Sequence, residues 1–160
     1  MLAMRIGFGF DVHRLSEGYD LWLGGIKIPH TKGSVGHSDA DVLLHAICDA
    51  ILGALALGDI GKHFPDTDAA YKGIDSKLLL AHVMKLVSEK GYKVGNIDAT
   101  LCLEKPKIMP YVDGMRACIA SICNVTIEDI SVKATTNEKL GYIGNEEGVN
   151  AYAVALMLKQ

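Results

Sequence analysis

The sequence lacks the features that mark several special classes of protein. Its richest apolar run, residues 51–57, ends at Gly58, well short of the roughly 18 residues that a membrane-spanning helix needs. It has no basic run and no patch of interleaved basic and aromatic residues, and its formal net charge is -3, which argues against nucleic acid as a partner. No repeat, low-complexity segment or linker divides it. We therefore expect one soluble domain over residues 1–160 that binds neither membranes nor nucleic acids.

Cysteines are few and not arranged as redox or metal pairs. The four of them include no C-x-x-C motif, and the chain starts without the charged and apolar regions of a secretory signal. They are Cys48, Cys102, Cys118 and Cys123. We interpret them as buried thiols in a protein of the reducing cytoplasm.

The rest of the composition indicates a globular core, because 49% of the residues are hydrophobic and 22% are charged. Residues 148–158 are ambiguous, since their Ala and Leu content favours a helix whereas their alternation fits a strand. The other predicted elements are paired strands at 4–15 and 19–29, helices at 39–57, 76–90 and 110–123, strands at 96–105 and 129–136, and an irregular loop at 58–73. This alternation predicts an α/β fold with helices packed on a sheet.

The predicted helix at 39–57 carries polar residues that interrupt its apolar pattern. Asp41, His45 and Asp49 are spaced by four residues, so they lie along one helix face. Ser38 is expected to be the N-cap of this helix, with His37 in the preceding loop, and Ser76 to be the N-cap of the next helix. The polar face has two interpretations: an edge that faces solvent, or the wall of a cleft.

A cleft with such a polar wall can bind a metal ion. Asp11 and His13 are two residues apart on a predicted strand, so their side chains leave the same face, and His45 is a candidate third ligand. One carboxylate and two imidazoles suit Zn²⁺, and three protein ligands leave a fourth position open, as in catalytic sites. The D-x-H motif is common, however, and the alternative is two strand residues at a surface edge.

A second candidate site follows the strand predicted at 129–136. The segment KATTNEKLGYIGNEEG, residues 133–148, contains lysine, two threonine hydroxyls and three glycines. This composition suits phosphate binding, although the segment lacks the residue order of a P-loop. A turn-rich loop is the alternative interpretation. Glu138 would repel a phosphate unless a divalent cation such as Mg²⁺ lay between them.

Four segments together resemble one enzyme family. GFDVHRL, GHSDADVLLHAICDAILGALALGDIGKHFPDTD, EKPKIMP and KATTNEKLGYIGNEEG are similar, in order and over nearly the whole chain, to the 2-C-methyl-D-erythritol 2,4-cyclodiphosphate synthases. The resemblance implies an α/β domain with a mixed sheet, assembled as a homotrimer with active sites between subunits. It also implies a phosphorus–oxygen lyase of the non-mevalonate isoprenoid pathway. Such a lyase converts 4-diphosphocytidyl-2-C-methyl-D-erythritol 2-phosphate to the cyclic diphosphate and CMP.

The same resemblance implies roles for individual residues. Asp11, His13 and His45 match ligands of one Zn²⁺ per subunit, and Glu138 matches the ligand of a Mg²⁺ or Mn²⁺ on the substrate diphosphate. The matching substrate contacts are His37, Ser38 and Asp66 for the methylerythritol phosphate, Asp59 and Gly61 for the ribose, and Pro106, Lys107, Ile108, Met109, Ala134, Thr135 and Thr136 around cytosine and diphosphate. Thr136, Glu138, His37 and Asp49 are the candidate catalytic groups, and Asp49 either orients an imidazole or lies at a helix edge.

The sequence differs from many members of the family at two positions, and two other functions are alternatives to the one that the resemblance implies. Asn145 stands where many relatives have Arg, and Tyr152 stands where a Glu is often seen, which puts in doubt an isoprenoid-phosphate effector site on the trimer axis. One rival function is a zinc phosphohydrolase that activates water. The other is an oligomeric nucleotide-binding module without turnover.

Overall fold

A five-stranded sheet forms the centre of the computed structural model, which describes residues 3–160. The strand order is β4-β1-β7-β5-β6, and every neighbouring pair is antiparallel except the parallel pair β5 and β6. Its strands are β1 (Met4–Glu17), β4 (Lys32–Val35), β5 (Tyr92–Cys102), β6 (Ile130–Thr135) and β7 (Gly148–Lys159). The expected mixed sheet is therefore confirmed.

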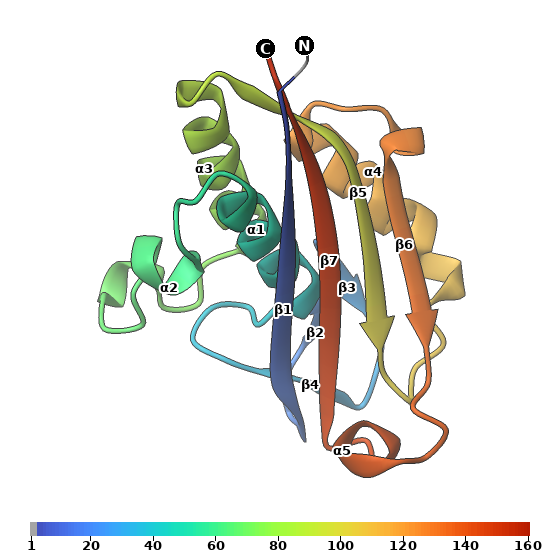
Figure 1. Ribbon diagram of the computed structural model, residues 1–160. Helices are drawn as coiled ribbons and strands as arrows, with labels where there is room; N and C mark the ends of the chain where they lie inside the picture. The colour runs from blue at the N-terminus through green and yellow to red at the C-terminus, as the bar shows by residue number, and fades with distance from the viewer. Residues whose placement is uncertain (1–2) are drawn as a thin grey trace.

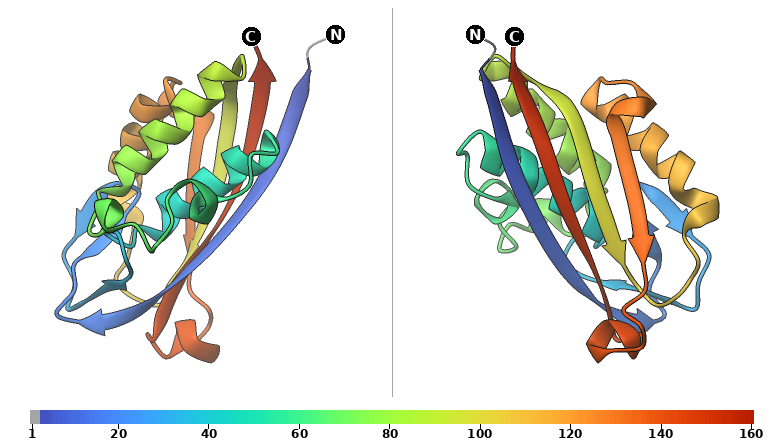
Figure 2. Two further views of the ribbon diagram at one scale, coloured as in Figure 1. Left: turned by 90° about the vertical axis from the view of Figure 1, so that its left-hand side faces the viewer. Right: turned by 45° about the vertical axis from the view of Figure 1, so that its right-hand side comes forward.

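The helices leave one face of this sheet open. In the views of Figures 1 and 2 the long helices lie on the same side of the strands, and α1 packs on β1 and β7 while α4 packs on β6. The helices are α1 (Val42–Ala54), α2 (Ile60–His63), α3 (Ser76–Glu89), α4 (Val112–Cys123) and α5 (Gly141–Gly144), with 3₁₀ turns at Ala69–Tyr71, Met109–Tyr111 and Ile127–Asp129. The structure thus has a two-layer α/β arrangement.

Two glycines of β1 bring α1 unusually close to the sheet. A Cβ at Gly7 would lie 1.8 Å from the Ala50 carbonyl oxygen, and one at Gly9 would lie 1.9 Å from that of Ala46. Only glycine permits the backbone of a helix to lie this close to a strand. Because Asp11 and His45 follow along the same two elements, this close packing positions the candidate metal ligands.

Several predictions of local structure were wrong. The segment 19–29 does not pair with β1 but forms its own two-stranded sheet, β2 (Leu21–Leu23) and β3 (Ile26–Ile28). The partners of β1 are β4 and, along most of its length, β7. Residues 148–159 are a strand, which settles their ambiguity, and the loop at 58–73 contains the short helix α2.

Both predicted serine caps were also wrong. The N-cap of α1 is Asp41, whose buried carboxylate accepts hydrogen bonds from the N–H groups of Leu44, Gly24 and Gly25. The N-cap of α3 is Asp75, which accepts from the N–H of Lys77. An aspartate can cap a helix as well as a serine can. The two serine hydroxyls are therefore free for another contact.

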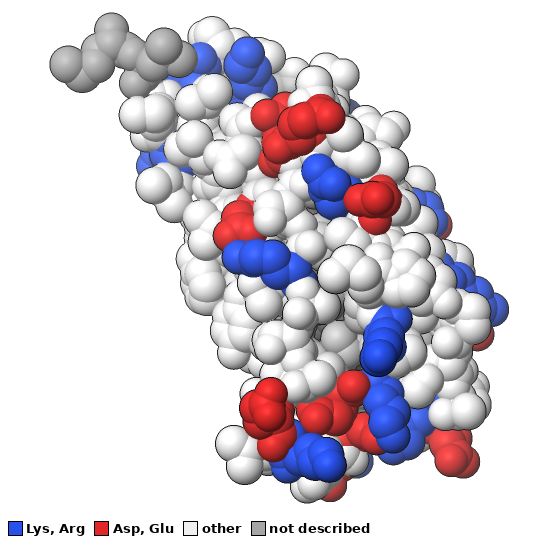
Figure 3. Space-filling view, turned by 90° about the vertical axis from the view of Figure 1, so that its right-hand side faces the viewer, with Lys and Arg blue, Asp and Glu red and all other residues white. Residues whose placement is uncertain are grey.

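On β1 and β7 the open face carries large apolar side chains. Seven of them on β1 and β7 are at least 40% exposed: Met4, Ile6, Phe8, Phe10, Val12, Tyr152 and Val154. By contrast, Figure 3 shows acidic and basic side chains interspersed on the side of the molecule around the β6 edge. A row of exposed aromatic and aliphatic residues of this kind marks an interaction surface.

The cysteines are all free thiols, as expected. Cys48, Cys102 and Cys123 are buried as predicted, but the prediction was wrong for Cys118, which is partly exposed. Burial raises the pKa of the Cys123 thiol to about 12. Among residues 3–160, no helix has the length and apolar character needed to cross a membrane.

Candidate active site

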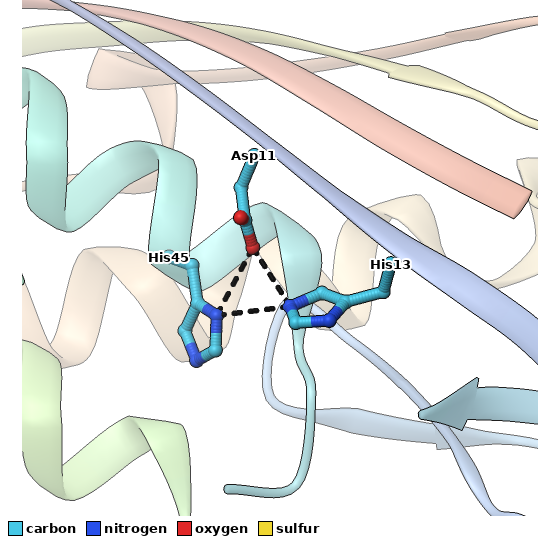
Figure 4. A group of neighbouring side chains, drawn as sticks. All are labelled: Asp11, His13 and His45. Carbon is cyan, nitrogen blue, oxygen red and sulfur yellow. Dashed lines mark hydrogen bonds and ion pairs between the residues drawn. The ribbon is translucent and has the colours of Figure 1, made fainter. Parts of the chain in front are cut away.

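Asp11, His13 and His45 converge on one point between β1 and α1, as Figure 4 shows. Asp11 Oδ2 lies 2.8 Å from His13 Nε2 and 3.0 Å from His45 Nδ1, and the two ring nitrogens are 3.2 Å apart. The prediction that Asp11 and His13 share a strand face is confirmed, and the polar face of α1 supplies the third group.

The donor set fits a zinc ion. Tetrahedral Zn²⁺ with bonds of about 2.0–2.2 Å separates its ligand atoms by about 3.4 Å. Separations of 2.8 to 3.2 Å would have to widen by only roughly 0.2 to 0.6 Å. Carboxylate oxygen and imidazole nitrogen are ordinary zinc ligands, and three of them leave a position for a substrate oxygen.

The outer nitrogen of each ring is held by a group outside the cluster. Nδ1 of His13 lies 3.1 Å from the carbonyl oxygen of Val35, which can only accept, so this nitrogen carries the hydrogen and Nε2 presents its lone pair to the cluster. Nε2 of His45 lies 2.9 Å from Ser76 Oγ and 3.1 Å from Ser38 Oγ. The two serines that do not cap helices therefore both contact His45.

The cluster also shifts the pKa values of Asp11 and His13. Burial alone would raise the pKa of Asp11, but the hydrogen bonds and charges of His13 and His45 outweigh it and lower this pKa from 3.8 to about 2. Burial likewise opposes protonation of His13, but its hydrogen bond to Asp11 and the charge of that carboxylate raise its pKa. A cation must therefore compete with a proton for His13, as is usual for histidine ligands.

A cavity of about 320 Å³ adjoins this cluster. Besides Asp11, His13 and His45 themselves, four other residues that the sequence pointed to line it: His37, Ser38, Gly61 and Asp66. Asp59 is exposed at the N-cap of α2, where its carboxylate accepts from the N–H of Lys62, and does not line the cavity.

An apolar wall of the same cavity was missed from sequence. It consists of Ile60, Phe64, Tyr71, Ile74 and Leu79. Phe64 is 8% exposed and meets the ring of Tyr71 edge-on at 5.4 Å between centroids. The sequence did contain one indication of this wall, because a phenylalanine within the polar stretch GKHFPDTD is expected to pack its ring against other apolar side chains. The wall suits the carbon skeleton of a small ligand whose charged end faces the cluster.

Asp49 makes no hydrogen bond with His45. Its carboxylate accepts from the N–H of Ile60 at 2.8 Å and so ties α2 to α1. Burial raises the pKa of Asp49, and the nearby carboxylates of Asp59 and Asp11 add to this effect. In this geometry Asp49 positions the α2 segment of the cavity rather than an imidazole.

A second cavity, of about 480 Å³, lies beside the end of β6. Its walls come from two segments that are distant in sequence, 103–112 and 132–136. They include all the residues expected around cytosine and diphosphate: Pro106, Lys107, Ile108, Met109, Ala134, Thr135 and Thr136. The fold thus brings these two segments together.

Glu138 lies on the exposed loop that follows β6. Glu138 and Lys139 adopt left-handed φ angles of 52° and 61°, which are uncommon outside glycine. The carboxylate of Glu104 supports this conformation by accepting from the N–H groups of Asn137 and Lys139, each at 3.1 Å. Glu104 was missed as a site residue, because its sequence neighbours gave no indication that it reaches this loop.

The two groups of site residues do not meet within one chain. Asp11 and His13 are on β1, Glu138 follows β6, and β7 and β5 lie between these strands. Strands spaced about 4.8 Å apart put β1 and β6 about 14 Å apart across the sheet. Glu138 is accordingly not among the groups gathered at the metal cluster.

Comparison with known proteins agrees with this geometry. The model of the YgbB family matches residues 4–158. The chain belongs to the YgbB family. The 2-C-methyl-D-erythritol 2,4-cyclodiphosphate synthase of Porphyromonas gingivalis is 64% identical over 154 residues, which cover 96% of this chain and 95% of the relative. The resemblance noted in the sequence is therefore confirmed for this YgbB-family chain.

Solved structures give the same result. The structure of IspF from Plasmodium falciparum in complex with CDP has a TM-score of 0.86 at 35% identity, and the match covers 99% of this chain and 97% of that one. The bifunctional IspDF from Campylobacter jejuni has a TM-score of 0.96 at 40% identity. The YgbB-family chain described here is covered completely but spans 43% of that bifunctional chain.

Proposed function

We propose that the protein carries out the cyclisation for which its relatives are named, at sites formed between neighbouring subunits of a homotrimer. The substrate is 4-diphosphocytidyl-2-C-methyl-D-erythritol 2-phosphate, and the products are 2-C-methyl-D-erythritol 2,4-cyclodiphosphate and CMP. The enzyme is a phosphorus–oxygen lyase of the non-mevalonate pathway. The observation that carries the proposal is the convergence of Asp11, His13 and His45 beside a cavity with an apolar wall.

The reaction needs no nucleophile from the protein. An oxygen of the substrate's own 2-phosphate attacks the β-phosphorus, the bond from this phosphorus to the oxygen shared with the α-phosphorus breaks, and CMP leaves with that oxygen. Positioning and charge neutralisation must then supply the rate. Cations held by the metal cluster and by Glu138 would act as Lewis acids on the diphosphate, Zn²⁺ at the first and Mg²⁺ or Mn²⁺ at the second.

The residues of the two cavities bind the substrate and exclude water. His37, Ser38 and Asp66 hold the methylerythritol phosphate end, and the apolar wall packs against its carbon skeleton and excludes water. The second cavity receives the cytosine between Pro106 and Met109. The Thr136 hydroxyl binds a diphosphate oxygen, while Asp59 and Gly61 approach the ribose.

Two features of the single chain support the proposed arrangement of subunits. The metal cluster and Glu138 lie on separate strands, and the open face of the sheet exposes a row of apolar side chains that a second copy would cover. Tyr152 lies on this face with its ring 5.2 Å from that of Phe10. This aromatic pair provides no cation for an isoprenoid phosphate, in line with the doubt that Tyr152 raises about such an effector on the trimer axis. The four free thiols suit a cytoplasmic location.

Product analysis tests the activity itself. We expect phosphorus NMR of the protein with the diphosphocytidyl substrate and Mg²⁺ to show CMP and a cyclic diphosphate in equal amounts. Inorganic phosphate or an open-chain diphosphate would instead identify a phosphohydrolase. Cytidine nucleotide binding without turnover, even in Asp11→Asn, would identify a binding module.

Mixed trimers test the arrangement between subunits. His45→Ala and Glu138→Gln chains, each inactive alone, would be co-expressed with different tags and the doubly tagged trimers isolated. If each site joins the cluster of one subunit to the loop of the next, a mixed trimer contains one intact site among three and regains roughly a third of wild-type turnover. Properly mixed trimers that remain as inactive as the parents would place the whole site in a single subunit.

A further inference from the structure

Ser76 is completely buried, yet its hydroxyl makes one contact that its role in the helix does not explain. Its Oγ lies 2.9 Å from Nε2 of His45, the ring nitrogen opposite the metal cluster. We propose that Ser76 and Asp39 together form a positioning pair that fixes the tautomer and orientation of His45 for metal binding. The inference rests on the proposed metal site and goes beyond it, since neither residue belongs to the ligand or substrate set.

The direction of the hydrogen bonds carries the argument. Asp39 Oδ1 accepts the hydroxyl hydrogen of Ser76 and the N–H of Asp41, and Oδ2 accepts the N–H of Ser76 at 2.9 Å. A serine hydroxyl has a single hydrogen. Because this hydrogen goes to the carboxylate, Ser76 Oγ can only accept from His45.

It follows that Nε2 of His45 carries the ring hydrogen. A neutral imidazole has only one N–H, so Nδ1 must present its lone pair to Asp11 and His13. The Val35 carbonyl selects the opposite nitrogen of His13 in the same way. Each imidazole of the cluster thus has an acceptor on its outer side that turns a lone pair towards the metal position.

Ser38 contacts the same nitrogen but does not have this role. Its Oγ is 3.1 Å from His45 Nε2 and accepts the N–H of Ala40, but among residues 3–160 no carboxylate or carbonyl oxygen accepts its hydrogen. It also lines the substrate cavity, which Ser76 does not. The Ser38 hydroxyl is thus free to turn towards a phosphate, whereas that of Ser76 is committed to the carboxylate of Asp39.

Two variants test the pair, and a third provides a matched control. Ser76→Ala removes the acceptor. Asp39→Asn keeps the shape but lets an amide donate to Ser76, so that Ser76 can donate to His45 and favour the wrong tautomer. Ser34→Ala removes another buried serine hydroxyl, one that has no hydrogen-bond partner among residues 3–160. Zinc affinity would be measured by chelator competition, and the His45 tautomer by ¹⁵N NMR of the purified proteins.

We expect both test variants to bind zinc 10- to 100-fold more weakly, as is typical when the outer partner of a metal-bound histidine is lost. The control should match the wild type. Ser76→Thr, which keeps the hydroxyl, should recover most of the affinity, and the Nε2–H signal of His45 should persist only where the acceptor persists. A merely structural role would lower thermal stability without changing the tautomer.

The possible outcomes separate this inference from the proposed function. If the wild type binds zinc and His45→Ala does not, but Ser76→Ala and Asp39→Asn bind it as tightly as the control, the positioning pair is refuted and the metal site stands. If wild type and His45→Ala bind zinc equally, the metal site is refuted and the pair with it.

Discussion

The metal cluster and the Glu138 loop are both expected to hold a cation, but they are built in opposite ways. The cluster joins β1 to the buried helix α1, and Asp11, His13 and His45 contact one another directly. The loop lies at an edge, where Thr136, Asn137 and Glu138 are exposed and the Glu104 carboxylate provides two of its backbone contacts. One region is preorganised by the core, and the other is held locally.

This difference indicates an order of assembly. A cluster of three mutually touching ligands binds its cation without substrate, because the protein has already oriented the groups. A single carboxylate on an exposed loop binds a hard cation weakly and needs the phosphate oxygens of the substrate to complete the coordination. Zinc should therefore remain bound through purification, whereas the second cation should arrive with the substrate.

The largest effect should come from the preorganised region. His45→Ala removes one of three ligands, so the purified protein should contain much less zinc and turnover should fall on the order of 1,000-fold or more, as loss of several kcal/mol of charge stabilisation implies. Metal analysis and the release of CMP measure the two effects. Undiminished zinc in the variant would mean that the assignment of the cluster is wrong.

A smaller effect is expected from the loop. Glu138→Gln leaves the cluster intact, so zinc content should match the wild type while turnover falls on the order of 100-fold, the usual cost of one well-placed electrostatic group. Added Mg²⁺ should restore part of the lost rate. Wild-type rates for this variant at limiting Mg²⁺ would show that Glu138 holds no cation, and the contrast between the two regions would disappear.

The sequence predicted the first region better than the second, for physical reasons. The period of two on a strand and of about four on a helix put Asp11, His13 and His45 on the correct faces. The partner of β1 was not predictable in this way, because β7 is more than 130 residues away along the chain, whereas local reasoning favours the adjacent segment 19–29. Asp41, three residues after Ser38, and Asp75, just before Ser76, were as able to cap as the predicted serines, and only the tertiary contacts of the serines with His45 decide between them.

The contacts that hold the Glu138 loop could hardly be predicted from the sequence. Glu104 and Lys139 are 35 residues apart in the chain, and their contact depends on the parallel pairing of β5 with β6. The left-handed φ angles of Glu138 and Lys139 occur at residues with no local preference for them. The composition of the loop and the family resemblance both pointed to Glu138 as a ligand, but neither gave information on what holds the loop.

The smallest effect should come from that support, and it tests whether the loop is indeed held locally. Glu104→Gln keeps only one acceptor oxygen and Glu104→Ala keeps none, so the two N–H groups of Asn137 and Lys139 lose one or both partners. At about 1 kcal/mol for each exposed bond, we expect kcat/KM to fall roughly 5-fold in the first variant and roughly 30-fold in the second.

A charge-matched control separates loop geometry from the loss of one negative charge. Glu147→Gln removes an exposed carboxylate nearby, one for which the described part of the chain shows no side-chain hydrogen bond, and it should leave kcat/KM unchanged. Zinc content should be the same in all three variants, because β7 and β5 separate the loop from the cluster within a chain. The Mg²⁺ concentration for half-maximal rate should rise in the order control, Gln, Ala, since a loop that leaves its left-handed conformation moves the Glu138 carboxylate away from the diphosphate. Equal losses in the control and in Glu104→Gln would make the effect one of charge alone, and the loop would then owe its conformation to the neighbouring subunit rather than to Glu104.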